Sequence, residues 1–156
     1  MSLLDRIRRR LRATHPGVIL AGLDLVGLAI ASYLSVVELR GELPSCGPLR
    51  GCEQVALSAY SRIGGVPVAV LGVGLSLVLF CLAIAWCRTN DRRLLAAHYG
   101  LSLLGVVFEL YFTAIELFVI GAVCVWCASY GISLVARFLV ALWIWIHRDP
   151  IDPIRT

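Results

Sequence analysis

Four long apolar runs dominate the pattern of hydrophobic and polar positions along the chain. They cover residues 17–37, 66–86, 94–120 and 123–146. Each run is close to or above the roughly 20 residues that an α-helix needs to cross about 30 Å of hydrocarbon. None shows the period of two that is typical of membrane β-barrel strands. The pattern therefore predicts an all-α membrane protein, a single domain built as a bundle of four transmembrane helices.

The polar segments between these runs divide the rest of the chain. They are a basic arm (1–16), a long loop (38–65), a short loop (87–93) and a tail (147–156). The apolar run after the arm is too long for a signal peptide, so we expect it to be retained as a helix. Within the long loop, Glu53–Tyr60 alternates apolar and polar residues, which predicts a short helix lying on the membrane surface. Gly64 and Gly65, followed by Pro67, predict the start of the next transmembrane helix.

Composition and charge support a membrane protein and indicate how it is oriented. The chain is 60% hydrophobic with a mean hydropathy of +0.88, well above the roughly 45–50% apolar content of soluble domains. Its net charge of +4 comes from arginine alone, and eight of the fourteen arginines lie in the basic arm and the Arg88–Arg93 segment. Because this charge gathers at one membrane face, we expect no nucleic-acid partner. The positive-inside rule places both termini and the 87–93 loop in the cytoplasm, and the 38–65 loop outside.

The cysteines carry the candidate chemistry. The chain has six: Cys46, Cys52, Cys81, Cys87, Cys124 and Cys127. The first two and the last two are predicted to face an oxidising compartment, where disulfides form and persist. Cys124 and Cys127 form a C-x-x-C whose sulfurs share one helix face at the predicted outer mouth of the last run. The helix N-terminus favours a thiolate there, whereas burial in lipid opposes it.

Other interpretations of these cysteines remain open. Cys46 and Cys52 can be a structural staple, and the C-x-x-C pair can be packing residues. Four cysteines can also bind zinc, but the three histidines fall at or near the predicted cytoplasmic side, so no metal is expected. Two pairs on one membrane face favour a redox relay. We expect Cys81 and Cys87, in the predicted cytoplasmic half, to be packing residues that are dispensable for activity.

The cysteine motifs resemble those of the vitamin K epoxide reductase family, over nearly the whole chain. The similar segments are Cys46-Gly-Pro-Leu-Arg-Gly-Cys52 with the following Glu-Gln-Val and Ser58, Gly65-Val-Pro67, and Glu116–Ser129 with its C-x-x-C. The five-residue gap between the loop cysteines resembles the bacterial branch, because vertebrate members have a longer gap. In the rival DsbB-type family the C-x-x-C belongs to the first outer loop, which is the reverse of the order found here.

The resemblance implies an electron relay. Cys46 and Cys52 correspond to shuttle cysteines that take electrons from a thioredoxin-fold partner, and Cys52 would then exchange with Cys124. Cys127 would face a membrane quinone and form a charge-transfer or covalent adduct with it. Ser58 corresponds to a serine or threonine near the quinone, although it can equally be a surface hydroxyl. Because the chain has no fused thioredoxin-like domain, the resemblance implies a DsbA-like partner acting in trans.

One departure from the family concerns a tyrosine that contacts the quinone in vertebrate members, four residues beyond the second C-x-x-C cysteine. This chain has Gly131 at that position and Tyr130 one residue earlier, so Tyr130 is the candidate here. The implied function is a thiol:quinone oxidoreductase of the bacterial inner membrane that supports disulfide formation, with menaquinone or ubiquinone as the electron acceptor. The alternatives are a vitamin K quinone or epoxide reductase, and a non-catalytic disulfide-stapled or metal-binding membrane protein.

Charged residues inside the apolar runs need partners, because an unpaired charge in a membrane is costly. At about 1.5 Å per residue, Asp24, Glu109 and Arg137 all lie about 18–20 Å below the outer face. The sequence therefore predicts that Arg137 pairs with Glu109, with Asp24 or with both. Glu116, about 8 Å deep by the same count, is a candidate for supplying a proton to the reduced quinone, or alternatively for a hydrogen bond to a neighbouring helix.

Overall fold

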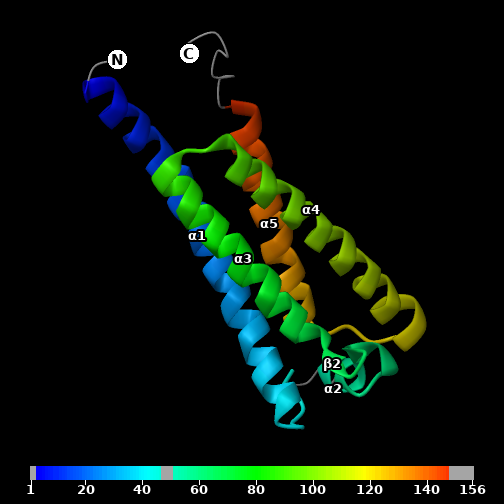
Figure 1. Cartoon of the computed structure of the whole chain (residues 1–156). Coiled ribbons are helices and arrows are strands. Elements are labelled where there is room, and N and C mark those ends of the chain that lie inside the picture. Colours follow the sequence, from blue (N-terminus) through cyan, green and yellow to red (C-terminus); the bar gives the residue numbers. More distant parts are fainter. Residues whose placement is uncertain (1–2, 47–50, 148–156) are drawn as a thin grey trace.

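The computed structural model describes residues 3–46 and 51–147, with the backbone alone for residues 3–15. Within these ranges the long helices are α1 (Leu3–Leu39), α3 (Val68–Thr89), α4 (Arg92–Ile115) and α5 (Val125–His147) (Figure 1). Segments long and apolar enough to cross a membrane are Pro16–Leu39, Val68–Thr89, Arg92–Ile120 and Val125–His147. The predicted all-α bundle of four membrane-spanning helices is confirmed. The side chains of most of the predicted basic arm, and residues 148–156 of the predicted tail, lie outside the described residues.

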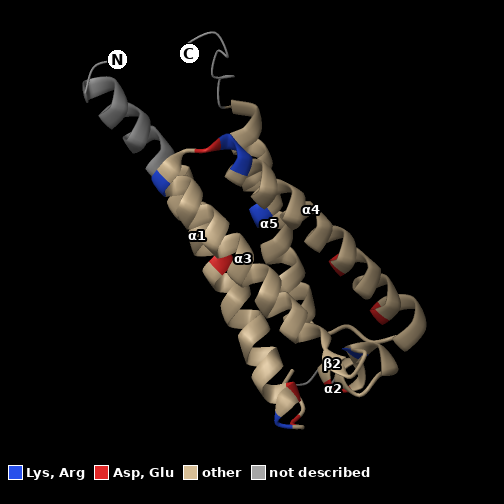
Figure 2. Ribbon diagram, in the orientation of Figure 1, with Lys and Arg blue, Asp and Glu red and all other residues tan. Residues whose placement is uncertain are grey.

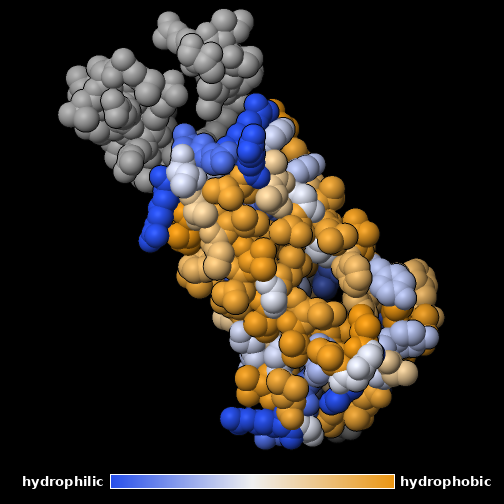
Figure 3. All heavy atoms as spheres, in the orientation of Figure 1, coloured by the Kyte–Doolittle hydropathy of each residue, from blue (hydrophilic) through white to orange (hydrophobic). Residues whose placement is uncertain are grey.

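The four helices form a ring. Helix α1 packs against α3 and α5, and α4 packs against the same two helices, so α1 and α4 occupy opposite corners. One end carries the long loop, and we call it the loop end. The other end carries Arg88 in the last turn of α3 and Arg92 and Arg93 in the first turn of α4, and we call it the arginine end (Figure 2). Hydrophobic side chains cover most of the surface between the two ends, as expected for contact with lipid (Figure 3).

Two apolar clusters fill the bundle. The cluster nearer the arginine end contains the fully buried Leu20, Trp86 and Ile144 with their neighbours. The cluster nearer the loop end is smaller and consists of Ala31, Tyr130 and Leu134. Close helix packing depends on small residues, as is usual in membranes. A Cβ atom at Gly105 of α4, for example, would lie 2.8 Å from Leu75 Cδ2 and 3.0 Å from Leu134 Cδ2.

The long loop contains more regular structure than the sequence pattern predicts. Its surface helix α2 spans Gly51–Ala56, so it begins two residues earlier than the expected Glu53–Tyr60 helix and ends earlier, and a 3-10 turn, η2 (Ala59–Ser61), follows. Two short strands, β1 (Arg62–Ile63) and β2 (Val66–Pro67), then form an antiparallel hairpin that was not predicted. Its two-residue turn, Gly64-Gly65, has φ values of 59° and 86°, as a type I′ turn requires. Helix α3 begins directly after Pro67.

The connection from α4 to α5 is shaped by a π-helical turn. After Ile115 the helix widens into η3 (Glu116–Ile120) and ends at Gly121, whose φ of 70° lies in the left-handed region. The backbone N–H of Ala122 donates to the carbonyl of Glu116 at 3.1 Å, which closes the turn. Single π-turns often occur at functional sites because they redirect side chains. Here the turn directs Glu116 toward the start of α5.

Candidate active site

The C-x-x-C motif forms the N-terminus of α5. Cys124 lies just before the helix, and its carbonyl accepts the first helical hydrogen bond from Ala128 N–H at 2.9 Å. Its sulfur accepts the backbone N–H of Cys127 at 3.3 Å. Cys124 therefore occupies the N-cap position, and Cys127 occupies the third position of the helix. An N-cap side chain normally accepts a hydrogen bond from the unpaired N–H group at that third position. Cys124 is buried and Cys127 is half-buried.

The hydrogen bonds from Cys127 favour the thiolate of Cys124, which lies in the connection between two membrane spans. The Cys127 thiol lowers the pKa of the Cys124 thiol below its usual value, and the backbone N–H of Cys127 acts in the same direction. Burial and the nearby Glu116 carboxylate oppose this shift. The net effect is a thiol of lowered pKa, and the thiolate is the form that attacks disulfides.

Glu116 joins the two cysteines. Its side chain is almost fully buried, and its Oε2 accepts the backbone N–H of Cys124 at 3.1 Å. One oxygen of Glu116 and the two sulfurs all lie within 4.8 Å of one another. A carboxyl group in this position can take or return a proton as the thiols change state.

A disulfide joins Cys46 and Cys52 in the loop, with their Cα atoms 5.8 Å apart. Both sides of this disulfide are held against the start of α5. On one side, Gly51 approaches the carbonyl of Val123 so closely that any side chain at position 51 would collide with it. On the other, Trp126 Nε1 donates to the carbonyl of Ser45 at 3.0 Å. The disulfide is therefore held close to the C-x-x-C motif by contacts that do not involve its sulfurs.

A cavity of about 290 Å³ lies beside Cys127 in the half of the bundle nearer the loop end. Residues of α1, α3, α4, η3, α5 and the long loop line it, and most of them are apolar. The polar or ionisable side chains in its wall include Glu38, Ser58, Glu109, Glu116, Cys127 and Tyr130. Few polar groups in an apolar wall are typical of sites for small hydrophobic ligands. Figure 3 shows a hollow in the surface with hydrophilic atoms at its floor and hydrophobic atoms around it.

The structure brings the predicted site residues to this region. Cys127, Glu116, Ser58 and Tyr130 all line the cavity, whereas Cys124 lies behind Cys127 at the start of α5. The hydroxyl of Ser58 donates to the carbonyl of Val55 at 2.7 Å within its own loop. That bond uses its only proton, so Ser58 presents its oxygen to a ligand as an acceptor.

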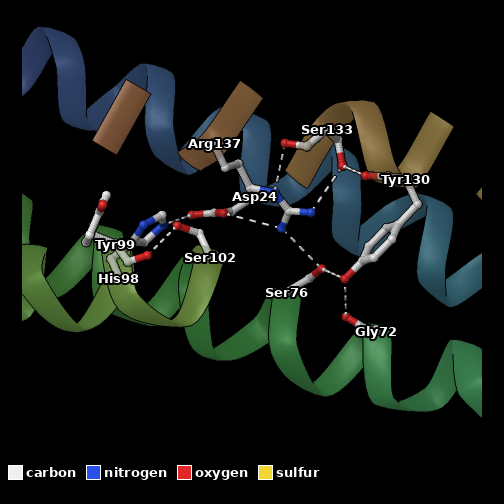
Figure 4. A network of polar contacts seen from close by, with 9 residues as sticks. All are labelled: Asp24, Gly72, Ser76, His98, Tyr99, Ser102, Tyr130, Ser133 and Arg137. Carbon is white, nitrogen blue, oxygen red and sulfur yellow. Dashed lines mark hydrogen bonds and ion pairs between the residues drawn. The ribbon is translucent and has the colours of Figure 1, made fainter. Parts of the chain in front are cut away.

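Tyr130 is held by hydrogen bonds at the wall of the cavity. Its hydroxyl donates to the carbonyl of Gly72 at 3.1 Å and shares a 3.2 Å hydrogen bond with Ser76 Oγ (Figure 4). Ser76 in turn accepts a hydrogen bond from Arg137 Nη1 at 3.3 Å. These contacts connect the cavity wall to a buried polar cluster in the middle of the bundle.

That cluster is centred on Arg137 and Asp24, which are fully buried. Arg137 Nη1 lies 3.5 Å from Asp24 Oδ1, and the other Asp24 oxygen lies 3.1 Å from Nε2 of His98 on α4, at the opposite corner of the ring. Ser133 accepts two more hydrogen bonds from Arg137, one at its carbonyl and one at its hydroxyl. The predicted pairing of Arg137 with Asp24 is confirmed. The alternative partner, Glu109, is not used, because among the described residues Arg137 forms an ion pair with Asp24 alone.

Three contributors were missed by the sequence analysis. Glu109 lines the cavity, although the sequence predicted a structural ion pair for it. Trp126 ties the disulfide loop to α5, and its place inside the C-x-x-C was the available signal. His98 shares Asp24 with Arg137, although it was placed only at or near the cytoplasmic side. Cys81 and Cys87 lie on the half of α3 nearer the arginine end and do not line the cavity.

A pair of free cysteines, one buried and one half-buried, lies beside a disulfide and an apolar cavity at the end of a membrane bundle, as in a membrane thiol oxidoreductase. The model of the vitamin K epoxide reductase family matches residues 18–142, and the chain belongs to that family. The resemblance drawn from the cysteine motifs is thereby confirmed. The protein is accordingly a multi-pass membrane oxidoreductase of the thiol–quinone class, in a family that works with quinones and thioredoxin-like partners. No similar curated protein was found.

Proposed function

We propose that the protein oxidises the dithiol of a thioredoxin-fold partner, passes the electrons to a lipid-dissolved quinone and so supports disulfide formation in exported proteins. One observation carries this proposal. The Cys46–Cys52 disulfide is held against the C-x-x-C, and Cys127 of that motif lines an apolar cavity. The loop disulfide, the C-x-x-C and the cavity therefore follow one another in the order that the proposed electron transfer requires.

The first exchange takes place at Cys46. Cys46 is half-buried whereas Cys52 is fully buried, so a partner thiolate reaches the sulfur of Cys46 first. Its attack forms a partner–Cys46 disulfide and breaks the Cys46–Cys52 bond, which leaves Cys52 as the thiolate. The second partner cysteine then attacks the partner's own sulfur. The partner leaves oxidised, and Cys46 and Cys52 are both reduced.

The second exchange moves the electrons to the C-x-x-C. The Cys52 thiolate attacks the sulfur of Cys124 in a Cys124–Cys127 disulfide and releases Cys127. Cys46 then attacks Cys52, which restores the loop disulfide and leaves Cys124 and Cys127 reduced. The close approach of Gly51 to Val123 supports this order, because it sets the residue before Cys52 against the residue before Cys124.

The last step is oxidation of the Cys124–Cys127 dithiol next to the cavity. A quinone fits the residues present, because the wall is largely apolar with a few polar groups beside Cys127. When bound, a quinone accepts two electrons and two protons. Cys127 is the cysteine in contact with the cavity, and Glu116 is placed to take the thiol proton and return it. Ser58 and Tyr130 complete the polar wall. Menaquinone and ubiquinone both belong to this chemical class.

We further propose that the protein lies in the bacterial inner membrane with both termini in the cytoplasm and the loop end outside. Arg88, Arg92 and Arg93 at the arginine end support this orientation by the positive-inside rule. The loop disulfide supports it too, because disulfides persist in oxidising compartments. An alkaline phosphatase reporter inserted after Glu42 should be active, and one inserted after Asn90 should be inactive. The opposite result would reverse the orientation.

Complementation tests the function. A bacterium that lacks its membrane enzyme for disulfide formation is given this protein together with a thioredoxin-fold partner from a species with this enzyme family. The wild type should restore disulfides in an exported reporter, Cys127→Ala should not, and Cys81→Ala should behave as the wild type. If the wild type is expressed in the membrane and restores nothing, the proposed function is wrong.

A second candidate function is metal binding, which the grouping of Glu116, Cys124 and Cys127 favours. Structural zinc sites normally use four protein ligands, and this group supplies three. Elemental analysis of the purified protein separates the two functions. One zinc per chain that is retained after dialysis against a chelator would favour metal binding. Quinone reduction by a metal-free protein would show that the reaction does not need a metal ion.

A further inference from the structure

Glu109 is an acidic residue of the cavity to which the relay described so far gives no role. It lies on α4, and the cation expected to neutralise it, Arg137, is paired with Asp24 instead. Space for its side chain is provided by Gly131 of α5. A Cβ atom at position 131 would lie 2.8 Å from Glu109 Cγ and 2.9 Å from its Oε1. The carboxyl group is therefore packed against bare backbone at the cavity wall, with no charged partner among the described residues.

Glu109 and Glu116 lie on the same side of one helical segment. Seven residues, or two turns, separate them, and both line the cavity, as the two acidic positions along α4 and η3 in Figure 2 illustrate. Glu116 is at the level of Cys127, and Glu109 lies deeper by about 10 Å along the axis. They are near enough for their charges to interact with each other and with Cys127. One wall of the cavity thus presents two carboxyl groups at different depths.

We propose that Glu109 is a second proton carrier of the reaction, serving the substrate oxygen that lies away from Cys127. This inference rests on the proposed function. Oxidation of the Cys124–Cys127 dithiol releases two electrons and two protons, and reduction of a quinone consumes the same number at two oxygens on opposite sides of its ring. Glu116 takes a proton from Cys127 and serves the near oxygen. Glu109 gives its proton to the far oxygen and is reprotonated from the thiols through Glu116.

The polar cluster does not carry protons from the arginine end to the cavity along its own hydrogen bonds. The hydrogen-bonded chain from His98 to Tyr130 passes through Asp24, Arg137 and Ser76. An arginine side chain does not release its proton in proteins, so Arg137 interrupts any relay along this chain. The Tyr130 hydroxyl already donates to the carbonyl of Gly72. The carboxyl groups of the cavity are therefore the groups placed to carry protons from the thiols.

Single-turnover reduction of a water-soluble short-chain ubiquinone by the fully reduced protein in nanodiscs tests the proposal. Glu109→Gln keeps the size and polarity of the side chain but cannot carry a proton, and should slow the reaction about 100-fold. Glu109→Asp should restore most of the rate. Gly131→Ala keeps the carboxyl group but displaces it, and should cost about tenfold. Glu53→Gln, an exposed acid of α2, is the matched control and should have no effect.

A second readout needs no quinone. Infrared difference spectra between the dithiol and disulfide states should contain carboxyl bands from both Glu109 and Glu116. Glu109→Gln should remove one of them, while partner-driven reduction of the Cys46–Cys52 disulfide, followed by alkylation and mass spectrometry, should be unchanged.

The results distinguish failure of the proposed function from failure of the role proposed for Glu109. A wild type that exchanges disulfides but never reduces a quinone overturns the proposed function. An active wild type with Glu109→Gln within twofold of its rate overturns the role of Glu109 alone. A variant that raises KM for the quinone without lowering kcat also overturns it, because Glu109 would then bind the substrate and carry no proton. If Glu109→Gln does not fold, Glu109→Asp and Gly131→Ala give the answer.

Discussion

The loop end and the middle of the bundle both contain buried ionisable side chains, but these side chains have charged partners only in the middle of the bundle. In the middle, Arg137 donates four hydrogen bonds and Asp24 is held by both Arg137 and His98. At the loop end, Glu109 and Glu116 line a cavity beside Cys127, and neither forms an ion pair among the described residues. The difference teaches that burial alone does not identify a catalytic group. In the proposed function, Arg137 and Asp24 are structural because their charges are paired with each other, whereas the carboxyl groups that face the cavity exchange protons.

Breaking the relay should have the largest effect. In a Cys81→Ala, Cys87→Ala background, which should keep wild-type activity, Cys46→Ser removes the thiol that resolves the second exchange. Turnover should cease, and a Cys52–Cys124 disulfide should accumulate, because exchange requires attack on one specific sulfur. Mass spectrometry of the alkylated, digested protein identifies the link. A Cys46–Cys124 disulfide that accumulates in Cys52→Ser, with no Cys52–Cys124 disulfide in Cys46→Ser, would reverse the roles of the two loop cysteines.

The polar cluster should control stability and not the redox chemistry. Arg137→Leu leaves Asp24 without its cation and should lower the free energy of unfolding by about 3–5 kcal/mol. A second change, Asp24→Leu, should recover part of this loss, with a coupling of about 1–2 kcal/mol. Reversible unfolding in mixed micelles measures both. Glu109→Leu is the matched control, since it should add to Arg137→Leu without coupling. Coupling to Glu109 in place of Asp24 would contradict the pairing described above.

The tether between the loop disulfide and α5 should have a moderate effect. Trp126→Phe retains an aromatic ring to pack on Tyr33, whose ring centroid is 4.7 Å from that of Trp126, but removes the hydrogen bond to Ser45. This hydrogen bond is expected to contribute about 1 kcal/mol to holding the loop against α5, so its loss should slow exchange between the two cysteine pairs about fivefold. Rapid-quench alkylation measures that step. A rate equal to wild type would mean that Gly51 alone positions the loop.

The smallest expected effect concerns the thiolate of Cys124. Its pKa is lowered mainly by the hydrogen bond from the Cys127 thiol. Cys127→Ala removes that bond, so the pKa should rise and the thiolate should form only at higher pH. The rate at which a small thiosulfonate modifies Cys124 should therefore shift to higher pH relative to the reduced wild type. A shift to lower pH would show that the Cys127 thiol raises the pKa of Cys124, and would contradict this account.

The sequence predicted the parts of the fold that depend on position along the chain. Run lengths defined the membrane helices, cysteine spacing and order indicated the family, and depth counting brought Asp24 and Arg137 to the same level. Depth gives no information about which side of a helix a residue occupies. Glu109 lies at a similar depth but faces the cavity, and for this reason depth alone left both Glu109 and Asp24 as possible partners of Arg137.

Other features depend on local geometry or on distant contacts that a sequence pattern does not contain. The π-turn that directs Glu116 to Cys124 N–H has no periodic signal in the sequence. The strands around Gly64-Gly65 are two residues long, too short for alternation to show. The partner of Trp126, the carbonyl of Ser45, is 81 residues away in the chain.

Quinone reduction by the purified protein shows whether electrons pass from the partner through Cys127 to the quinone. The wild type in nanodiscs is mixed with a reduced thioredoxin-fold partner and a short-chain ubiquinone, and quinone loss is followed by its ultraviolet absorbance alongside oxidation of the partner. We predict that one quinone is reduced for each partner dithiol oxidised, and that Cys127→Ala abolishes quinone loss while the partner still exchanges once with Cys46–Cys52. Partner oxidation that continues at the wild-type rate in Cys127→Ala would contradict the proposed electron path.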